Sequence, residues 1–249
     1  MPLILGINPL LEALNAGKAI EKIYLLSSKE GPAFSRIYHL AKEQHIPVVQ
    51  ADRQKMARLS GGKKHQGAVA LLSVVDYLPL ESLIEKVQKY AADANFLIVD
   101  QMSDPQNFGA IIRSAEILGI DGIIFSIKES VPVTEQVIKA SAGAIFHIDL
   151  CKVNNLNSAL LYLRECGIWI YSSSSQAKKT LWEMDFTRPQ AIIIGSEGHG
   201  IRPLLLRNSD EVFSIPKQGK TESLNASVAA GIIMAEIFKQ RQTQQVKTS

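Results

Sequence analysis

Short, fully apolar runs that alternate with helical patterns constrain the fold of this chain most strongly. Residues 96–99 and 191–194 contain only apolar side chains. Runs of this kind are typical of strands that lie buried on both faces in a parallel sheet. Helix and strand patterns alternate between and around these two runs, which favours a parallel sheet covered by helices. The sequence therefore predicts an α/β fold.

The first third of the chain shows the same alternation on a smaller scale. Asn8-Pro9 predicts the start of a helix that ends at Gly17, and Asp52 is expected to cap a short helix that runs toward Leu59. Further elements are predicted as strands over 20–27, 47–50 and 68–75 and a helix over 33–44. We expect residues 1–75 to form one small α/β domain.

The rest of the chain predicts a second, larger α/β domain over residues 93–249. Residues 76–92, with Pro79 and the mixture EKVQKYAADAN, predict a helical linker rather than a core element. The expected strands are 96–99, 122–125, 146–150, 168–171 and 191–194, and the expected helices are 107–118, 134–141, 156–166 and 223–239. The polar tail 240–249 is expected to be frayed.

Composition excludes several classes of protein. No apolar stretch approaches the roughly 18 uncharged residues that a membrane span requires. The first twenty residues lack a basic leader and include Glu12, so they do not predict a secretory signal. The two cysteines, Cys151 and Cys166, form no CxxC pair and have no histidine at metal-ligand spacing. They predict a cytoplasmic protein with small buried cysteines and no metal.

The positive charge gathers in the first 75 residues, which hold ten Lys/Arg and five Asp/Glu, whereas the whole chain carries a formal charge of +3. The clearest basic cluster is Arg53, Lys55, Arg58, Lys63 and Lys64, with His65 beside it. Cationic side chains release counterions from phosphates, so this cluster predicts salt-sensitive binding of nucleic acid. A solvated basic surface without a partner is the alternative interpretation.

Three polar, glycine-containing segments follow strands at the places where α/β sheets bind ligands. They are residues 100–109 with the following Arg113, residues 195–200, and residues 215–227. We expect one helix end to present Asn107 and Arg113 together, with a phosphate offsetting the charge of a buried arginine.

Simpler interpretations exist for these segments, since Asn107 can cap a helix and the glycines can make turns. The spacing in 195–200 excludes a hydrolase elbow, a dinucleotide fingerprint and a P-loop. A triad of Ser196, His199 and Asp210 is disfavoured because serine and aspartate are abundant.

Taken in order, these segments resemble the motifs of a known enzyme family. N-F-G-A-I-I-R-S-A at 107–115, G-S-E-G-H-G-I at 195–201 and I-P-K-Q-G-K-T-E-S-L-N-A-S-V-A at 215–229 are similar to the three motifs of the SpoU (TrmH/RlmB-type) RNA 2′-O-ribose methyltransferases, in the SPOUT superfamily. G-I-N-P-L-L-E-A-L at 6–14 and K-H-Q-G at 64–67 resemble the L30e-like substrate-binding domain of the RlmB-type 23S rRNA guanosine methyltransferases. The resemblance covers nearly the whole chain.

The resemblance implies a fold, a cofactor and a set of site residues. It implies an L30e-like first domain, a SPOUT catalytic domain with a deep trefoil knot, a homodimer, and S-adenosylmethionine as cofactor. Backbone groups of Gly195, Ile215 and Leu224 would hold the cofactor. The positions that match the family's polar active-site residues are Asn107, Arg113, Glu197, Ser223 and Asn225. The implied reaction is methylation of a ribose 2′-hydroxyl, on a guanosine of 23S rRNA.

Two roles stay open for Arg113. It either accepts the hydroxyl proton with help from the RNA phosphate, or it fixes that phosphate and polarises the hydroxyl, since a guanidinium is a poor base. The amides of Asn107 and Asn225 would position the ribose, and Ser223 would contact cofactor or RNA. Glu197 is expected to anchor its loop and orient Arg113.

Two other functions compete with an rRNA methyltransferase. One is methylation of a tRNA ribose, against which the separate first domain argues. The other is a non-catalytic RNA-binding or ribosome-assembly protein that works through the basic first domain; it would bind RNA without transferring a methyl group.

Overall fold

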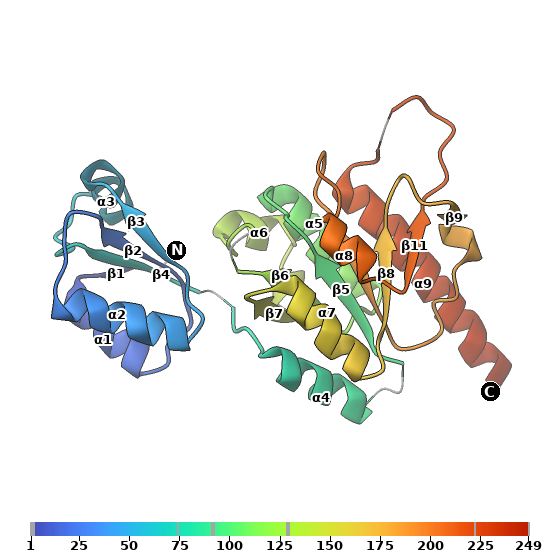
Figure 1. Ribbon diagram of the computed structural model, residues 1–249, viewed down its shortest axis with the longest axis horizontal. Coiled ribbons are helices and arrows are strands. Elements are labelled where there is room, and N and C mark those ends of the chain that lie inside the picture. Colours follow the sequence, from blue (N-terminus) through green and yellow to red (C-terminus); the bar gives the residue numbers. More distant parts are fainter. Residues whose placement is uncertain (1–2, 74, 91–92, 128–129, 222, 249) are drawn as a thin grey trace. The chain divides into compact units, whose positions relative to one another are not determined.

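The computed structural model describes residues 3–73, 75–90, 93–127, 130–221 and 223–248, which fold into two compact units. The first unit comprises the residues up to 76 together with 132–135, and the second comprises 77–131 and the residues from 136 onward. Both units contain helices and strands, as Figure 1 shows. The predicted α/β fold class, with a small first unit and a larger second unit, is confirmed.

The first unit is built on a four-stranded sheet in the order β1-β4-β2-β3. Its strands are β1 (Leu3–Leu5), β2 (Ile20–Leu26), β3 (Val48–Ala51) and β4 (Ala68–Leu72). Strand β2 pairs parallel with β3 and antiparallel with β4, and β1 pairs antiparallel with β4. The strand that the sequence predicts over 68–75 ends at Leu72, so it is shorter than expected.

Helices cover both faces of this sheet. Helices α1 (Ile7–Asn15) and α2 (Pro32–Glu43) cover one face, and α3 (Arg53–Ser60) covers the other (Figure 1). Alternate residues of β2 explain this: Ile23 and Leu25 join the core under α1 and α2, whereas Leu26 packs near Met56 of α3. The predicted Asp52 cap of α3 is confirmed, but α1 begins after Gly6, so the predicted start at Asn8-Pro9 is wrong.

The second unit is built on a seven-stranded sheet in the order β7-β6-β5-β10-β8-β11-β9, and all its strand pairs are parallel. The strands are β5 (Asn95–Val99), β6 (Gly122–Ser126), β7 (Asp149–Val153), β8 (Trp169–Ser173), β9 (Lys179–Thr180), β10 (Gln190–Ile194) and β11 (Glu211–Ser214). The sequence missed β9, which has two residues, and β11, whose polar ends hide its pattern. All seven carboxyl ends lie at one edge of the sheet.

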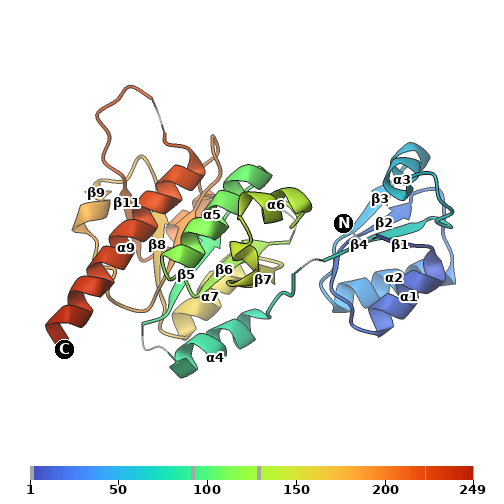
Figure 2. The ribbon, with the colours of Figure 1, turned by 180° about the vertical axis from the view of Figure 1, so that it is seen from behind.

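Helices cover both faces of the parallel sheet. Helices α4 (Leu80–Tyr90) and α7 (Leu156–Glu165) lie on the face turned toward the viewer in Figure 1, and α5 (Pro105–Ile117) and α9 (Ala226–Thr248) lie side by side on the face seen in Figure 2. Shorter helical segments complete the unit: α6 (Glu135–Ala140), α8 (Pro203–Arg207), and the 3-10 turns η1 (Ala144–Phe146) and η2 (Leu181–Glu183). The strand predicted from residue 146 begins only at Asp149.

The segment expected to be a linker instead supplies core. Leu80, Leu83, Ile84 and Val87 of α4 are buried in the main apolar cluster of the second unit. Their spacing of three, four and seven residues puts them on one face of a helix, a pattern that the polar composition obscured. The prediction of a linker is therefore wrong for residues 80–90; residues 91 and 92 lie outside the described residues.

The prediction of a frayed tail is also wrong. Helix α9 continues to Thr248. Gln240 accepts a hydrogen bond from the Phe186 backbone N–H (2.9 Å), and the nearly buried Arg241 donates to the carbonyls of Phe186 (3.1 Å) and Arg188 (2.9 Å). These hydrogen bonds attach the first residues of the expected tail to the backbone of residues 186 and 188. Ser249 lies outside the described residues.

Candidate active site

The candidate site lies at the carboxyl edge of the seven-stranded sheet. Residues 100–104 connect β5 to α5, residues 195–202 connect β10 to α8, and residues 215–225 connect β11 to α9. Because all the strands are parallel, these three connections start from the same edge. The polar segments that the sequence singled out are therefore neighbours in space.

Asn225 joins the three segments through its side chain. Its Nδ2 donates hydrogen bonds to Asn107 Oδ1 (3.0 Å) and to Glu197 Oε2 (3.1 Å). Its Oδ1 accepts from the backbone N–H groups of Ser227 (2.9 Å) and Val228 (3.4 Å), which caps α9. Both the oxygen and the NH₂ group of the Asn225 amide are thus hydrogen-bonded, so the orientation of this side chain is fixed. Three of the five predicted polar site residues, Asn107, Glu197 and Asn225, form one hydrogen-bonded cluster.

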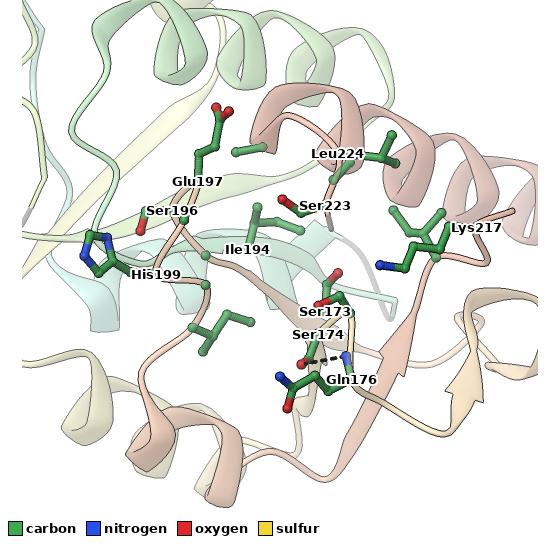
Figure 3. A pocket seen from close by; sticks show the side chains of 18 of the residues that line it. Ser173, Ser174, Gln176, Ile194, Ser196, Glu197, His199, Lys217, Ser223 and Leu224 are labelled. Atoms are coloured by element: carbon green, nitrogen blue, oxygen red, sulfur yellow. Dashed lines mark hydrogen bonds between the residues drawn. The ribbon is translucent and has the colours of Figure 1, made fainter. Parts of the chain in front are cut away.

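A pocket of about 680 Å³ borders this cluster. Figure 3 shows side chains from the segments that surround it, and Glu197 belongs both to its wall and to the Asn225 cluster. The three residues predicted to hold a cofactor, Gly195, Ile215 and Leu224, all line this pocket, and so does Ser223. The wall combines apolar side chains such as Ile194 and Ile201 with polar ones.

One wall of the pocket was missed from the sequence. Ser173 is the last residue of β8, and Ser174, Ser175 and Gln176 follow it along the pocket (Figure 3). Ser174 is held by a backbone hydrogen bond from its N–H to the Phe213 carbonyl (2.8 Å). A run of serines carries no motif of its own, but its position directly after an apolar strand is the signal that places it at the ligand-binding edge.

Gly195 is required by its own loop. A Cβ atom on Gly195 would lie 2.2 Å from the carbonyl carbon of Gly200 and 2.5 Å from the nitrogen of Ile201. The loop folds back here, with mutual backbone hydrogen bonds between Ser196 and Gly200 (3.2 and 3.0 Å). The lack of a side chain at Gly195 therefore allows the close approach of the chain to itself.

A Gly195→Ala variant is expected to unfold more easily and to bind S-adenosylmethionine more weakly. The added methyl group forces the 195–201 loop outward, and overpacking of this kind costs about 1–3 kcal/mol. Gly219→Ala is the matched control, because Gly219 lines the same pocket and a Cβ there meets open space. Urea unfolding and cofactor titration measure both effects. Equal stability of the two variants would contradict the assignment.

Arg113 lies apart from the cluster within one chain. It is exposed, in the third turn of α5, whereas Asn107 lies in the first turn. Six residues correspond to about 9 Å along the axis and to a different face of the helix. The expectation that one helix end presents both residues, with a buried arginine, is therefore wrong. The expectation that Glu197 orients Arg113 is also wrong within one chain, because Glu197 bonds to Asn225 instead, and among the described residues Arg113 has no hydrogen bond or ion pair.

Sequence patterns also missed an ion pair that attaches the 195–202 loop, which follows β10, to the end of β5. Asp100, fully buried at the end of β5, accepts from the Arg202 backbone N–H (3.0 Å), and its other oxygen lies 2.7 Å from an Arg202 guanidinium nitrogen. A buried carboxylate is stable only with such partners. This pair fixes the end of the 195–202 loop to the neighbouring strand.

The basic cluster of the first unit lies on and after α3. Arg53, Lys55 and Arg58 belong to this helix, Lys63 and Lys64 follow it, and all five side chains are exposed. Lys55 Nζ lies 5.3 Å from the ring centre of Tyr24. The partly buried His65 accepts a hydrogen bond from the Gly67 backbone N–H (3.1 Å), so it shapes the turn before β4.

The two cysteines belong neither to the pocket nor to the basic cluster. Burial raises the pKa of the Cys151 thiol to about 12, so this side chain stays a neutral thiol. In the part of the chain that the structure describes, no group of three or more His, Cys, Asp or Glu side chains has the arrangement of a metal site, and no helix is long and apolar enough to cross a membrane.

Comparison with known families agrees with this fold and site. Residues 94–235 match the SpoU rRNA Methylase family, and residues 3–78 match the family described as RNA 2′-O ribose methyltransferase substrate binding. The class of protein is therefore RNA methyltransferase, as predicted. The chain belongs to the SpoU rRNA methylase family.

Relatives and solved structures match nearly the whole chain. The chain is 34% identical over 238 residues to YacO of Bacillus subtilis (strain 168), whose name places it in the TrmH family of tRNA/rRNA methyltransferases; the match covers 96% of this chain and 95% of YacO.

Two solved structures share the fold. One is the SpoU methyltransferase AviRb from Streptomyces viridochromogenes in complex with AdoMet (TM-score 0.62, 22% identity, 97% of this chain and 90% of that chain). The other is the AdoMet-bound rRNA methyltransferase from Sinorhizobium meliloti (TM-score 0.60, 21% identity, 95% and 86%). The trefoil knot implied by the motifs stays a prediction.

Proposed function

We propose that this protein is a cytoplasmic homodimer that transfers a methyl group from S-adenosylmethionine to the 2′-hydroxyl of a ribose, on a guanosine of 23S rRNA. The observation that carries the proposal is the hydrogen-bonded cluster of Asn107, Glu197 and Asn225 at the wall of a ligand-sized pocket. Family membership supplies the reaction class. The separate basic first unit supports a large folded RNA as substrate, and favours rRNA over tRNA.

The pocket fits S-adenosylmethionine in size and chemistry. Its volume of about 680 Å³ lies within the usual range for small-ligand sites. Ile215 and Leu224 would offer apolar walls and backbone groups to an adenine, and the Glu197 carboxylate would complement the positive charge of the cofactor. When bound, this cofactor supplies an electrophilic methyl group. Gly195 keeps the loop folded against the cavity, and Ser223 contributes a hydroxyl to its wall.

The chain's own residues would hold the ribose and its phosphate. Asn225 uses its amide donors within the cluster, so we assign it the role of holding Asn107 and Glu197 in place, and the Asn107 amide would orient the sugar. Alignment alone lowers such a barrier by several kcal/mol, up to about 7–11 in favourable models. An exposed guanidinium is a cation that presents a planar fork to a phosphate. We therefore favour for Arg113 the role of fixing the RNA phosphate and polarising the hydroxyl, over the role of proton acceptor.

A second copy of the chain would give the exposed Arg113 a site to serve. Helices α5 and α9 lie side by side and expose apolar residues, with Ile117 at 64%, Val228 at 50% and Phe238 at 43% relative exposure. Large apolar side chains exposed on two neighbouring helices favour association. We assign this pair of helices to the homodimer interface. Arg113, on the exposed side of α5, would then reach the Asn225 cluster of the partner.

The basic cluster is assigned to RNA binding. A Lys63→Glu/Lys64→Glu variant is expected to bind RNA more weakly and with a flatter salt dependence, by about 0.7–0.9 in log–log slope for each phosphate that the variant no longer neutralises. Filter binding at several salt concentrations measures this slope. Lys18→Glu/Lys42→Glu makes the same charge change at exposed positions of the same unit outside the cluster. Equal effects in the two variants would show that the cluster is ordinary surface.

The proposed substrate is tested by mapping 2′-O-methyl groups on RNA from cells with and without this protein. We expect one ribose methylation of 23S rRNA, on a guanosine, to be lost without the protein. Loss of a methyl group from a tRNA instead would assign the protein to tRNA. No change in any RNA, together with RNA binding by the purified protein, would indicate the non-catalytic function.

A further inference from the structure

A second pocket, of about 330 Å³, lies at the same edge of the sheet as the first. Ser126 at the end of β6 and Asn154 just after β7 line it, and α8 separates the two pockets. Leu206 of α8 faces the first pocket, whereas Leu204 and Leu205 face the second. The proposed reaction assigns nothing to this cavity.

The amide oxygens of two asparagines in this second pocket are already engaged. Asn155 Oδ1 accepts from the backbone N–H groups of Asn157 (2.8 Å) and Ser158 (3.4 Å), which caps α7. Asn157 Oδ1 accepts from Asn208 Nδ2. An asparagine amide offers one acceptor oxygen and one donor NH₂ group. The Nδ2 groups are therefore what Asn155 and Asn157 present to a ligand.

Arg202 adds a cation to the same wall. Its side chain is 31% exposed, and its ion pair with the fully buried Asp100 holds the guanidinium in place. A guanidinium has only donor groups. The wall is thus rich in fixed hydrogen-bond donors, one of them charged, and suits a ligand that carries acceptors.

We propose that the second pocket binds a backbone phosphate of the RNA strand that carries the methylated ribose. Phosphate oxygens accept hydrogen bonds and do not donate them, whereas base edges combine both kinds of group. The pocket and the cluster proposed to hold the ribose both lie at the carboxyl edge of the same sheet, so we assign the pocket to a phosphate of the same strand. This inference rests on the proposed function for the identity of the strand.

Asn157→Asp tests the proposal with little change in shape. The carboxylate still accepts the hydrogen bond from Asn208, but an anionic oxygen replaces the Nδ2 donor. An acidic residue in the first turn of a helix is favourable, so the fold is expected to hold. Ser158→Asp is the matched control, because it adds the same charge to the same turn at a position outside the pocket.

We expect Asn157→Asp to weaken binding of an unmodified 23S rRNA transcript by about 10- to 100-fold, as for loss of a hydrogen bond to a charged group. Ser158→Asp should change the affinity by less than about threefold. The log–log salt slope of Asn157→Asp should fall by about 0.7 relative to the control. Equal affinities of the two variants, or equal slopes, would overturn the proposal.

Two further measurements separate this proposal from the proposed function. Asn155→Asp keeps the cap of α7 and should weaken RNA binding as Asn157→Asp does, while S-adenosylmethionine affinity and thermal unfolding stay at wild-type values. If the wild-type protein binds the transcript but does not methylate it, the proposed function fails. The ratio of the RNA affinities of Asn157→Asp and Ser158→Asp still shows whether the second pocket binds a phosphate. Failure of the wild-type protein to bind the transcript overturns both.

Discussion

Replacing Arg113 by alanine is expected to lower the methylation rate by about 10²-fold or more, to the point of abolishing activity, because the phosphate that places the ribose is no longer held. The exposed guanidinium lies outside the cofactor pocket, so the affinity for S-adenosylmethionine should stay close to the wild-type value. Transfer of a labelled methyl group to a 23S rRNA transcript measures the rate, and calorimetric titration measures the affinity.

Arg113→Lys serves as the conservative control for this prediction. Lysine keeps the positive charge but lacks the planar fork that binds a phosphate at two points. The activity of this variant should therefore lie between those of Arg113→Ala and the wild-type protein. Loss of cofactor binding with intact turnover at saturating cofactor would refute the assignment of Arg113.

Replacing Asn225 by aspartate is expected to lower the rate by about 10²-fold or more. The aspartate retains the oxygen that caps α9, so the fold should survive. It loses both hydrogen bonds donated to Asn107 and Glu197, and it places a second carboxylate beside Glu197. Two like charges at hydrogen-bond distance repel, and a displacement of about 1 Å in a positioning group can cost this much.

The control for Asn225→Asp is Ser227→Ala. It removes only the hydroxyl that also donates to Asn225 Oδ1 (2.6 Å) and leaves the amide donors in place. We expect near wild-type turnover from the control, and similar thermal unfolding temperatures for both variants. Full turnover by Asn225→Asp would show that the cluster does not orient the substrate.

Mixing these two inactive variants tests the shared site directly. If Arg113 serves the cluster of the partner, a mixed dimer of Arg113→Ala and Asn225→Asp contains one intact site. Random reassociation then restores about a quarter of wild-type activity in a twofold-symmetric dimer. If Arg113 serves its own chain, every site keeps one defect and the mixture stays inactive.

Local patterns predicted much of the fold. The apolar runs at 96–99 and 191–194 became adjacent central strands, and Asp52 caps α3 as its spacing indicated. The errors arose where polar residues hide a structural role. The apolar stripe of α4 lies among charged residues, and Gln240 and Arg241 look like a tail but bond to backbone carbonyls 53 residues away or more in the sequence.

For the candidate site, the residues were predictable from the sequence but their contacts were not. The three segments and all eight of the residues named for cofactor and catalysis came from the motifs, because residue type and spacing are local properties of the chain. Their convergence through Asn225 depends on strand order, which local patterns do not encode. The serine wall at 173–176, the Asp100–Arg202 pair and the second pocket likewise join residues far apart in sequence.

The sequence alone indicated most of the helices and strands through their hydrophobic periodicity, and the family resemblance of its three motifs indicated the chemistry, because both signals lie in consecutive positions. The tertiary structure alone decided which groups meet. It paired Asp100 with Arg202, and it left Arg113 outside its own chain's cluster. The physical reason is that parallel strands bring distant connections to one edge, and the contacts made there depend on the order of the strands.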